Sequence, residues 1–152
     1  MPEMWVNVGP QHPATHGLWD IRIKVDGDTI VDADPNIGYI HRGIEKLCEC
    51  RNYTQVIPLM DRVGYVSSMS WAILHVMTVE ELMGITPPPR AQYIRTIAFE
   101  LQRIASHLIF IGPFCENIGL LTMWLYAFRE RELVLDLFQL LSGARMHYNY
   151  PR

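Results

Sequence analysis

The segment Gly9–Gly17, which reads GPQHPATHG, carries the side chains best suited to chemistry in this chain. It combines two histidines, two prolines and two glycines. Proline fixes φ and removes an amide donor, and glycine adopts conformations that other residues avoid, so the segment predicts a rigid, sharply turned loop. Histidine can give or take a proton near neutral pH. The loop would therefore hold the imidazoles of His12 and His16 in set directions; the alternative is a surface turn whose histidines take no part in chemistry.

The residues on either side of this loop predict a small antiparallel sheet. Leu18–Val25 alternates apolar with polar residues, which is typical of a half-buried strand. Asp26-Gly27-Asp28 indicates a hairpin turn, and Asp34-Pro35-Asn36 should end the return strand. We therefore expect a first domain over residues 1–37, with the histidine loop at the edge of a sheet whose strands cover residues 5–8, 18–25 and 29–33.

The remainder of the chain predicts helices. Apolar residues at positions 94–108 recur at the i, i+3, i+4 spacing of a helix that faces a core, and further helices are expected over 44–53, 65–83 and 122–141. The most apolar stretch, 108–128, contains Gly112, Pro113 and Glu116. A membrane span needs about 20 predominantly apolar residues, so we interpret this stretch as core helices with a kinked turn. The predicted class is α+β, with the sheet followed by a mostly helical bundle over 38–152.

Composition excludes several classes of function. The formal net charge is −3 and the basic residues are dispersed, which argues against a nucleic-acid partner. Three cysteines, Cys48, Cys50 and Cys115, form no even disulfide framework, so a reducing compartment is expected. The first residues lack the pattern of a signal peptide. No HExxH or paired CxxC spacing is present, so no metal site is predicted in this chain.

Seven segments, in this order, resemble one family. The chain is similar to the N-terminal part of the large hydrophilic subunit of respiratory complex I, the 49-kDa or D-type subunit, which is related to the large subunits of nickel–iron hydrogenases. Members of the family are usually more than twice as long. The segments that carry the resemblance are Asn7–Gly17, Gly38–Leu47, Tyr53–Arg62, Pro87–Arg95, Glu100–Leu108, Phe128–Glu132 and Ser142–Tyr150.

The resemblance implies a hydrogenase large-subunit-like fold and a role in quinone reduction. The family forms a quinone chamber with a small, B-type subunit that carries a 4Fe-4S cluster. Its headgroup-binding histidine and tyrosine map onto His16 and Tyr65, which could orient the quinone and supply protons. Residues near the partner's cluster map onto Arg42 and His147. A cation there would favour the reduced cluster, and a titrating histidine would link its potential to pH.

Two positions depart from the family's pattern. Gly64 stands where the family often has an aspartate before the tyrosine, and Asn117 stands where an aspartate often partners the headgroup histidine. An asparagine can hydrogen-bond an imidazole but cannot stabilise imidazolium by charge, although the neighbouring Glu116 could substitute. These departures leave open a different membrane carrier as electron acceptor.

The hydrogenase alternative is disfavoured by the same region. Nickel–iron hydrogenases hold nickel with cysteines in an RxCxxC context, and the matching positions after Arg62 are Gly64 and Ser67. We therefore predict no nickel–iron site.

The sequence as a whole predicts a peripheral subunit of a proton-translocating NADH:quinone oxidoreductase-type complex, active only within that complex. Quinone would be the substrate, the 4Fe-4S cluster would belong to the partner subunit, NAD(H) would bind elsewhere if at all, and this chain alone would bind no cofactor. The expected location is the cytoplasmic face of the cell membrane, or the matrix side of the inner membrane in a mitochondrion. The alternatives are a related archaeal-type dehydrogenase of reduced deazaflavin or ferredoxin, and a non-catalytic scaffold.

Overall fold

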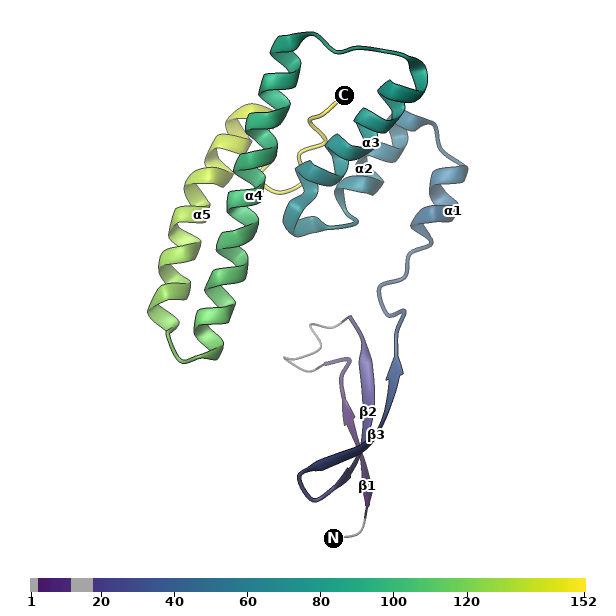
Figure 1. Ribbon diagram of the computed structural model, residues 1–152, viewed down its shortest axis with the longest axis vertical. Coiled ribbons are helices and arrows are strands. Elements are labelled where there is room, and N and C mark those ends of the chain that lie inside the picture. The colour runs from purple at the N-terminus through teal and green to yellow at the C-terminus, as the bar shows by residue number, and fades with distance from the viewer. Residues whose placement is uncertain (1–2, 12–17) are drawn as a thin grey trace. The chain divides into compact units, whose positions relative to one another are not determined.

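The computed structural model describes residues 3–11 and 18–152, and the chain divides into two compact units, residues 1–44 and 45–152 (Figure 1). His12 and His16, the histidines of the predicted loop, lie outside the described residues. The sequence predicted a boundary at residues 37 and 38.

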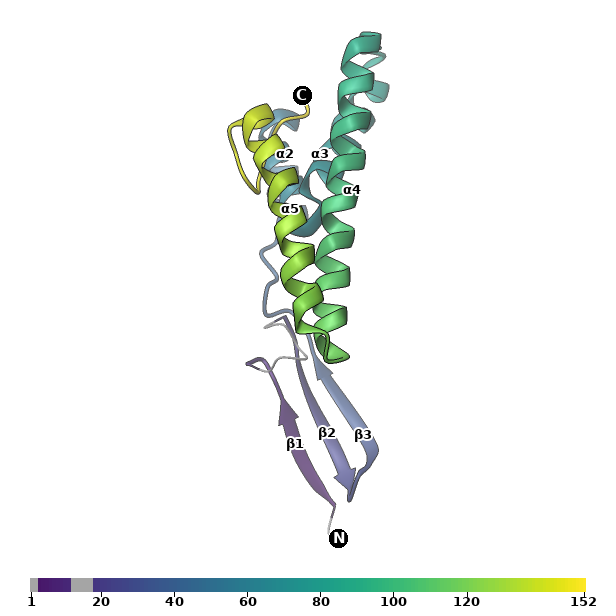
Figure 2. The same ribbon diagram turned by 90° about the vertical axis from the view of Figure 1, so that its left-hand side faces the viewer.

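The first unit is a three-stranded antiparallel sheet in the order β1-β2-β3, as expected (Figure 2). Its strands are β1 (Met4–Val8), β2 (Asp20–Asp26) and β3 (Thr29–Asn36). The return strand does not end at Asp34 but continues through Pro35, which pairs with Ile21 of β2. Proline is tolerated there because β3 is an edge strand, where a missing amide donor leaves no neighbour unpaired. Asn7 Nδ2 donates to the carbonyl oxygen of Gly9 (2.8 Å) where the chain leaves β1.

The second unit is helical, which confirms the α+β class (Figure 1). A short 3-10 helix, η2 (Tyr65–Ser67), precedes α3. The α-helices are α1 (Ile44–Glu49), α2 (Tyr53–Asp61), α3 (Ser68–Met83), α4 (Pro89–Asn117) and α5 (Leu121–Ser142).

The helix expected over 44–53 is wrong in extent, because a new helix begins at Tyr53. Asn52 is the cause. Its side chain accepts a hydrogen bond from the amide of Gln55 (2.9 Å), and the Gln55 side chain accepts one from the amide of Asn52 (3.3 Å). This reciprocal pair is a capping box, which satisfies amides that lack a partner within the helix. It ends the path of α1 and starts α2.

The kinked turn expected within 108–128 lies later than Gly112 and Pro113. Helix α4 continues through both residues to Asn117, and the chain reverses at Gly119, whose φ is +89°. Gly112 serves helix packing instead: a Cβ there would lie 2.7 Å from Cδ1 of Trp124 and 3.2 Å from the ring of Phe128, both on α5.

Small residues on α4 allow α5 to approach closely. Ala98, Ala105 and Gly112 stand seven positions apart, share one side of the helix and are buried. The core they help to form also includes Met69, Ile73, Val134, Phe138 and Tyr148. The prediction that the apolar stripe faces a core is therefore correct for Ala98 and Ala105, which are buried. It is wrong for Ile97 and Ile104, which are 60% and 51% exposed.

The contact at Gly112 predicts whether replacing this glycine by alanine stabilises or destabilises the protein. In a helix interior, alanine is more favourable than glycine by about 1 kcal/mol. Here we expect Gly112→Ala to lower the free energy of unfolding by about 1–3 kcal/mol, because the new methyl group meets the Trp124 indole. Thermal unfolding measures this change. The double variant Gly112→Ala/Trp124→Leu should recover part of the loss, and a higher melting temperature for the single variant would contradict the packing described.

Candidate functional site

Tyr65 is held by its backbone while its side chain stays accessible. Tyr65 is the first residue of η2 and is 53% exposed. The side-chain amide of Gln102, a buried residue of α4, donates to the carbonyl oxygen of the next residue, Val66 (2.8 Å). The start of η2 is thus fixed to the middle of α4, and the phenol is free to meet a ligand.

The indole of Trp71 occupies the space beside Gly64. A Cβ at Gly64 would lie 2.1 Å from Nε1 of Trp71, closer than any side chain tolerates. With Trp71 in this rotamer, an aspartate at position 64 would clash with the indole, so Trp71 would have to move before a carboxylate could stand there. No carboxylate therefore comes from that position to the neighbourhood of the phenol.

His147 is anchored on the ends of α2 and α3. Its Nδ1 lies 3.2 Å from Oδ2 of Asp61, the last residue of α2. The hydroxyl of Ser68, the first residue of α3, donates to the carbonyl oxygen of Met146 (2.9 Å). Since Ser68 follows η2 directly, these two contacts bring His147 to the same part of the unit as the Tyr65 segment.

Asp61 is a buried carboxyl group in a mixed environment. Its side chain has no exposed surface, and this burial raises the pKa of the carboxyl, while His147, Arg62 and Ser68 oppose the rise. Arg62 Nη1 lies 3.7 Å from Oδ2. The hydroxyl of Ser68 donates to the carbonyl oxygen of Met146, and Oδ1 of Asp61 has no hydrogen-bond partner within 3.5 Å among the described residues.

Aromatic packing continues this cluster toward α5. The ring of Tyr148 packs on Phe138 with a centroid distance of 4.5 Å, and burial raises the pKa of the phenol to about 12. Burial also lowers the pKa of the nearby Arg131 guanidinium, whose Nε has no hydrogen-bond partner among the described residues. Arg145 forms ion pairs with Glu132 and, at 3.7 Å, Asp136.

The structure also describes two other predicted site residues, Arg42 and Asn117. Arg42 is exposed and belongs to the 1–44 unit. Asn117 ends α4, 15 residues beyond Gln102, which corresponds to about 22 Å along the helix at about 1.5 Å per residue. The structure therefore does not place Asn117 next to the Tyr65 segment. Its predicted partner, His16, lies outside the described residues.

Sequence reasoning gave no role to Asp61, Gln102 or Tyr148. Asp61 stands inside the segment Tyr53–Arg62 and Tyr148 inside Ser142–Tyr150, so both belong to segments that carry the resemblance. What was missing is the contact between the two segments. Other histidines do have structural roles: Nε2 of His75 forms a hydrogen bond with the carbonyl oxygen of Tyr53 (2.9 Å).

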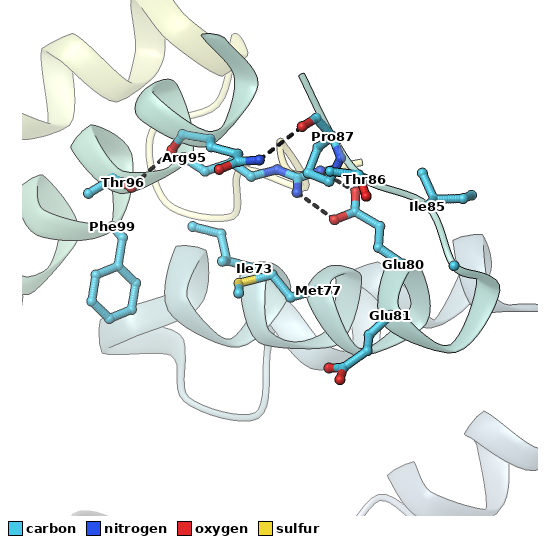
Figure 3. Close-up of a pocket in the computed structure, with 12 residues that line it drawn as sticks. Ile73, Met77, Glu80, Glu81, Ile85, Thr86, Pro87, Arg95, Thr96 and Phe99 are labelled. Carbon is cyan, nitrogen blue, oxygen red and sulfur yellow. Dashed lines mark hydrogen bonds and ion pairs between the residues drawn. The ribbon is translucent and has the colours of Figure 1, made fainter. Parts of the chain in front are cut away.

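A groove of about 770 Å³ lies between α3 and α4 (Figure 3). Ile73, Met77 and Phe99 give it apolar walls, and Glu80 and Arg95 face each other across it. Their side chains share two hydrogen bonds of 2.6 and 2.7 Å, which lower the pKa of the Glu80 carboxyl. The pair braces the two helices, and the groove contains none of the predicted site residues.

Within the part of the chain that the structure describes, no three metal-ligating side chains cluster together, and no helix has the length and apolar character needed to cross a bilayer. Gly64, which precedes η2, and Ser67, the last residue of η2, stand where a hydrogenase would carry cysteines and offer no thiolate. The residues therefore do not fit a nickel–iron centre.

Comparison with known proteins agrees with the resemblance. The family model of the respiratory-chain NADH dehydrogenase 49 kDa subunit matches residues 117–152, and that of nickel-dependent hydrogenases matches residues 42–112. The D-type subunit of the NADH-quinone oxidoreductase of Carboxydothermus hydrogenoformans is 54% identical over 150 residues, which cover 99% of this chain and 41% of that protein. Its counterpart in Bacillus cytotoxicus is 51% identical over 150 residues, with the same coverage of 99% and 41%.

A solved structure supports the same relation. A chain in the structure of the membrane-bound sulfane sulfur reductase (MBS), an archaeal respiratory membrane complex, matches with a TM-score of 0.90 and 35% identity. The match covers 98% of this chain and 40% of that chain. Fold and sequence thus define a large-subunit class shared by respiratory complexes and hydrogenases. Within it, the chain is similar over nearly its whole length to D-type subunits of NADH-quinone oxidoreductase, and it spans about two fifths of the length of these relatives.

The buried phenol of Tyr148 makes stability depend on pH in the alkaline range. Its pKa is raised from 10.0 to about 12 in the folded protein, so the folded state holds this proton more tightly than the unfolded chain. The associated stability is present below about pH 10 and is lost as the pH rises to about 12; a shift of this size corresponds to roughly 2–3 kcal/mol. We expect the free energy of unfolding of Tyr148→Phe to fall less than that of the parent protein over this pH range, as measured by denaturant unfolding at a series of pH values. Tyr93→Phe, at an exposed position, is the control and should leave the profile unchanged.

Proposed function

We propose that this chain forms part of the quinone-reducing site of a complex I-like oxidoreductase. The observation that carries the proposal is the 54% identity with a D-type subunit over nearly the whole chain, together with an accessible Tyr65 on a fixed backbone. In the complex, the chain would act next to a B-type subunit with a 4Fe-4S cluster, and its activity would depend on that assembly.

Tyr65 would bind the quinone headgroup through its phenol. Reduction of a quinone to a quinol takes two electrons and two protons. A phenol O–H can donate a hydrogen bond to a quinone carbonyl oxygen and pass it a proton as negative charge develops there. Because Gln102 holds the backbone of η2, the segment that carries the phenol is anchored to α4.

His16 is the second proposed headgroup ligand, with Asn117 as the residue that hydrogen-bonds its imidazole. Asn117 is an amide, so it can orient the ring but cannot stabilise an imidazolium by charge. Glu116, the preceding residue of α4, is exposed and could supply that charge.

Arg42 and His147 would act near the partner's cluster, which supplies electrons when bound. Both are partly or fully accessible, as residues at a subunit contact must be before assembly: Arg42 is exposed, and the side chain of His147 is 32% exposed. A cation at either residue stabilises added negative charge in its surroundings.

The chain would be a peripheral subunit on the cytoplasmic face of the membrane, or on the matrix side of the inner membrane in a mitochondrion. Electron transfer in the complex would be coupled to proton translocation. NADH, ferredoxin or a reduced deazaflavin would deliver electrons through other subunits.

The central test is Tyr65→Phe in the assembled complex. Loss of the phenolic proton should reduce quinone reductase turnover by about 100-fold, the lower end of what general acid–base groups contribute. Tyr93→Phe, on the exposed side of α4, is the matched control and should retain activity. Normal quinone reduction in both Tyr65→Phe and His16→Ala complexes would overturn the proposed site.

A second candidate function is reduction of a different acceptor. Gly64 favours it, because Trp71 fills the space where the family often places an aspartate beside the headgroup tyrosine. The similar chain of known structure comes from a sulfane sulfur reductase. Assaying one complex with a quinone analogue and with polysulfide, under the same electron donor, separates these functions. A non-catalytic scaffold would reduce neither and would show no binding competition by a quinone analogue.

A further inference from the structure

The hydrogen bond between Asp61 and His147 gives the imidazole ring a direction. When the carboxyl of Asp61 is ionised, its Oδ2 can only accept, and the hydrogen bond to His147 (3.2 Å) then places the proton on Nδ1. In the neutral ring, Nε2 then keeps its lone pair and points away from Asp61. A carboxylate that fixes a histidine in this way selects its tautomer and orientation.

The pair has a buried end and an accessible end. Asp61 has no exposed surface, whereas the side chain of His147 is 32% exposed. Solvent therefore reaches part of the His147 side chain while the carboxylate of Asp61 stays buried. In such surroundings, the attraction between an imidazolium and a carboxylate is stronger than in water.

A purely structural tie would not need a carboxylate at this position. The hydrogen bond from Ser68 to the carbonyl oxygen of Met146 already fixes the chain beside His147. A buried carboxyl group also costs free energy, and here Oδ1 has no hydrogen-bond partner among the described residues. A group retained at that cost and aimed at a histidine indicates a role for its charge.

The charged and titratable neighbours come from several elements. On α2, Arg62 lies 3.7 Å from Oδ2 of Asp61 and also donates to the carbonyl oxygen of Pro58 (2.9 Å). Tyr148 adjoins His147 in sequence, and Arg131 of α5 and Arg145 act on its phenol. Arg145 is itself paired with the carboxylates Glu132 and Asp136 of α5.

We propose that Asp61 is a positioning residue for His147, which it holds so that Nε2 is the atom that exchanges a proton with the surroundings. When Nε2 takes up one proton from solvent, the charge of the pair changes from −1 to 0 and the carboxylate stabilises the imidazolium. This deepens the role proposed for His147 and rests on the proposed function only for the identity of the group that faces Nε2.

The experiment measures exchange of the imidazole Cε1–H of His147 for deuterium in the purified, assembled complex, by mass spectrometry of the His147 peptide over a series of pH values. Exchange proceeds through the imidazolium, so its pH midpoint follows proton binding. In the near-isosteric variant Asp61→Asn we expect this midpoint to fall, since the carboxylate that would stabilise the imidazolium is gone.

Two controls accompany this measurement. Asp136→Asn removes an exposed carboxylate of α5 and should leave the midpoint at His147 unchanged. His107, exposed on α4, is measured in the same samples as an internal reference and should not respond to Asp61→Asn.

An unchanged midpoint at His147 in an assembled Asp61→Asn complex would overturn the inference and leave Asp61 as a structural tie. If this variant does not assemble, Asp61→Ser, which removes the charge with a smaller side chain, should show the same fall. The readout does not require turnover, so a complex that fails the Tyr65 test for quinone reduction still reports on Asp61.

Discussion

A carboxyl group buried at the end of a helix costs free energy unless a donor or a cation meets it, and here the donor comes from a residue 86 positions later in the chain. Oδ2 of Asp61 lies 3.2 Å from Nδ1 of His147, and this hydrogen bond brings the chain after α5 back to the end of α2. Together with the hydrogen bond from Ser68 to the carbonyl oxygen of Met146, this contact fixes the path of the last residues and the place of His147.

The packing of α4 divides the helix into two apolar faces with different roles. Ala98, Ala105 and Gly112 allow close contact with α5, whereas Ile97 and Ile104 remain exposed. Exposed apolar surface of this extent is typical of proteins that work within assemblies. A subunit of a respiratory complex would have this character, and the same feature explains why the apolar spacing predicted the helix correctly but not its buried side.

The fold followed from the sequence where local signals agreed, and failed where side chains competed for backbone groups. Period-two alternation predicted β2, and left-handed glycines at positions 84 and 143 end α3 and α5 near the expected residues. Helix α2 was missed because its start depends on the Asn52 capping box and because Pro58 lies inside it. The partnership of Asp61 with His147 was beyond prediction, since no local pattern links residues so far apart.

The exchange of a carboxylate for a glycine at position 64 alters the proposed chemistry of Tyr65 in a definite direction. With Trp71 over Gly64, the exposed phenol has no carboxylate from that position beside it. Negative charge that develops on a bound acceptor would meet less repulsion there, since two like charges near a protein surface repel by about 4 kcal/mol at about 4 Å. The same change removes a group that could return a proton to the phenol. Re-protonation of Tyr65 would then come from solvent or from the acceptor's other ligand, so access of water to η2 becomes part of the catalytic cycle rather than a source of loss.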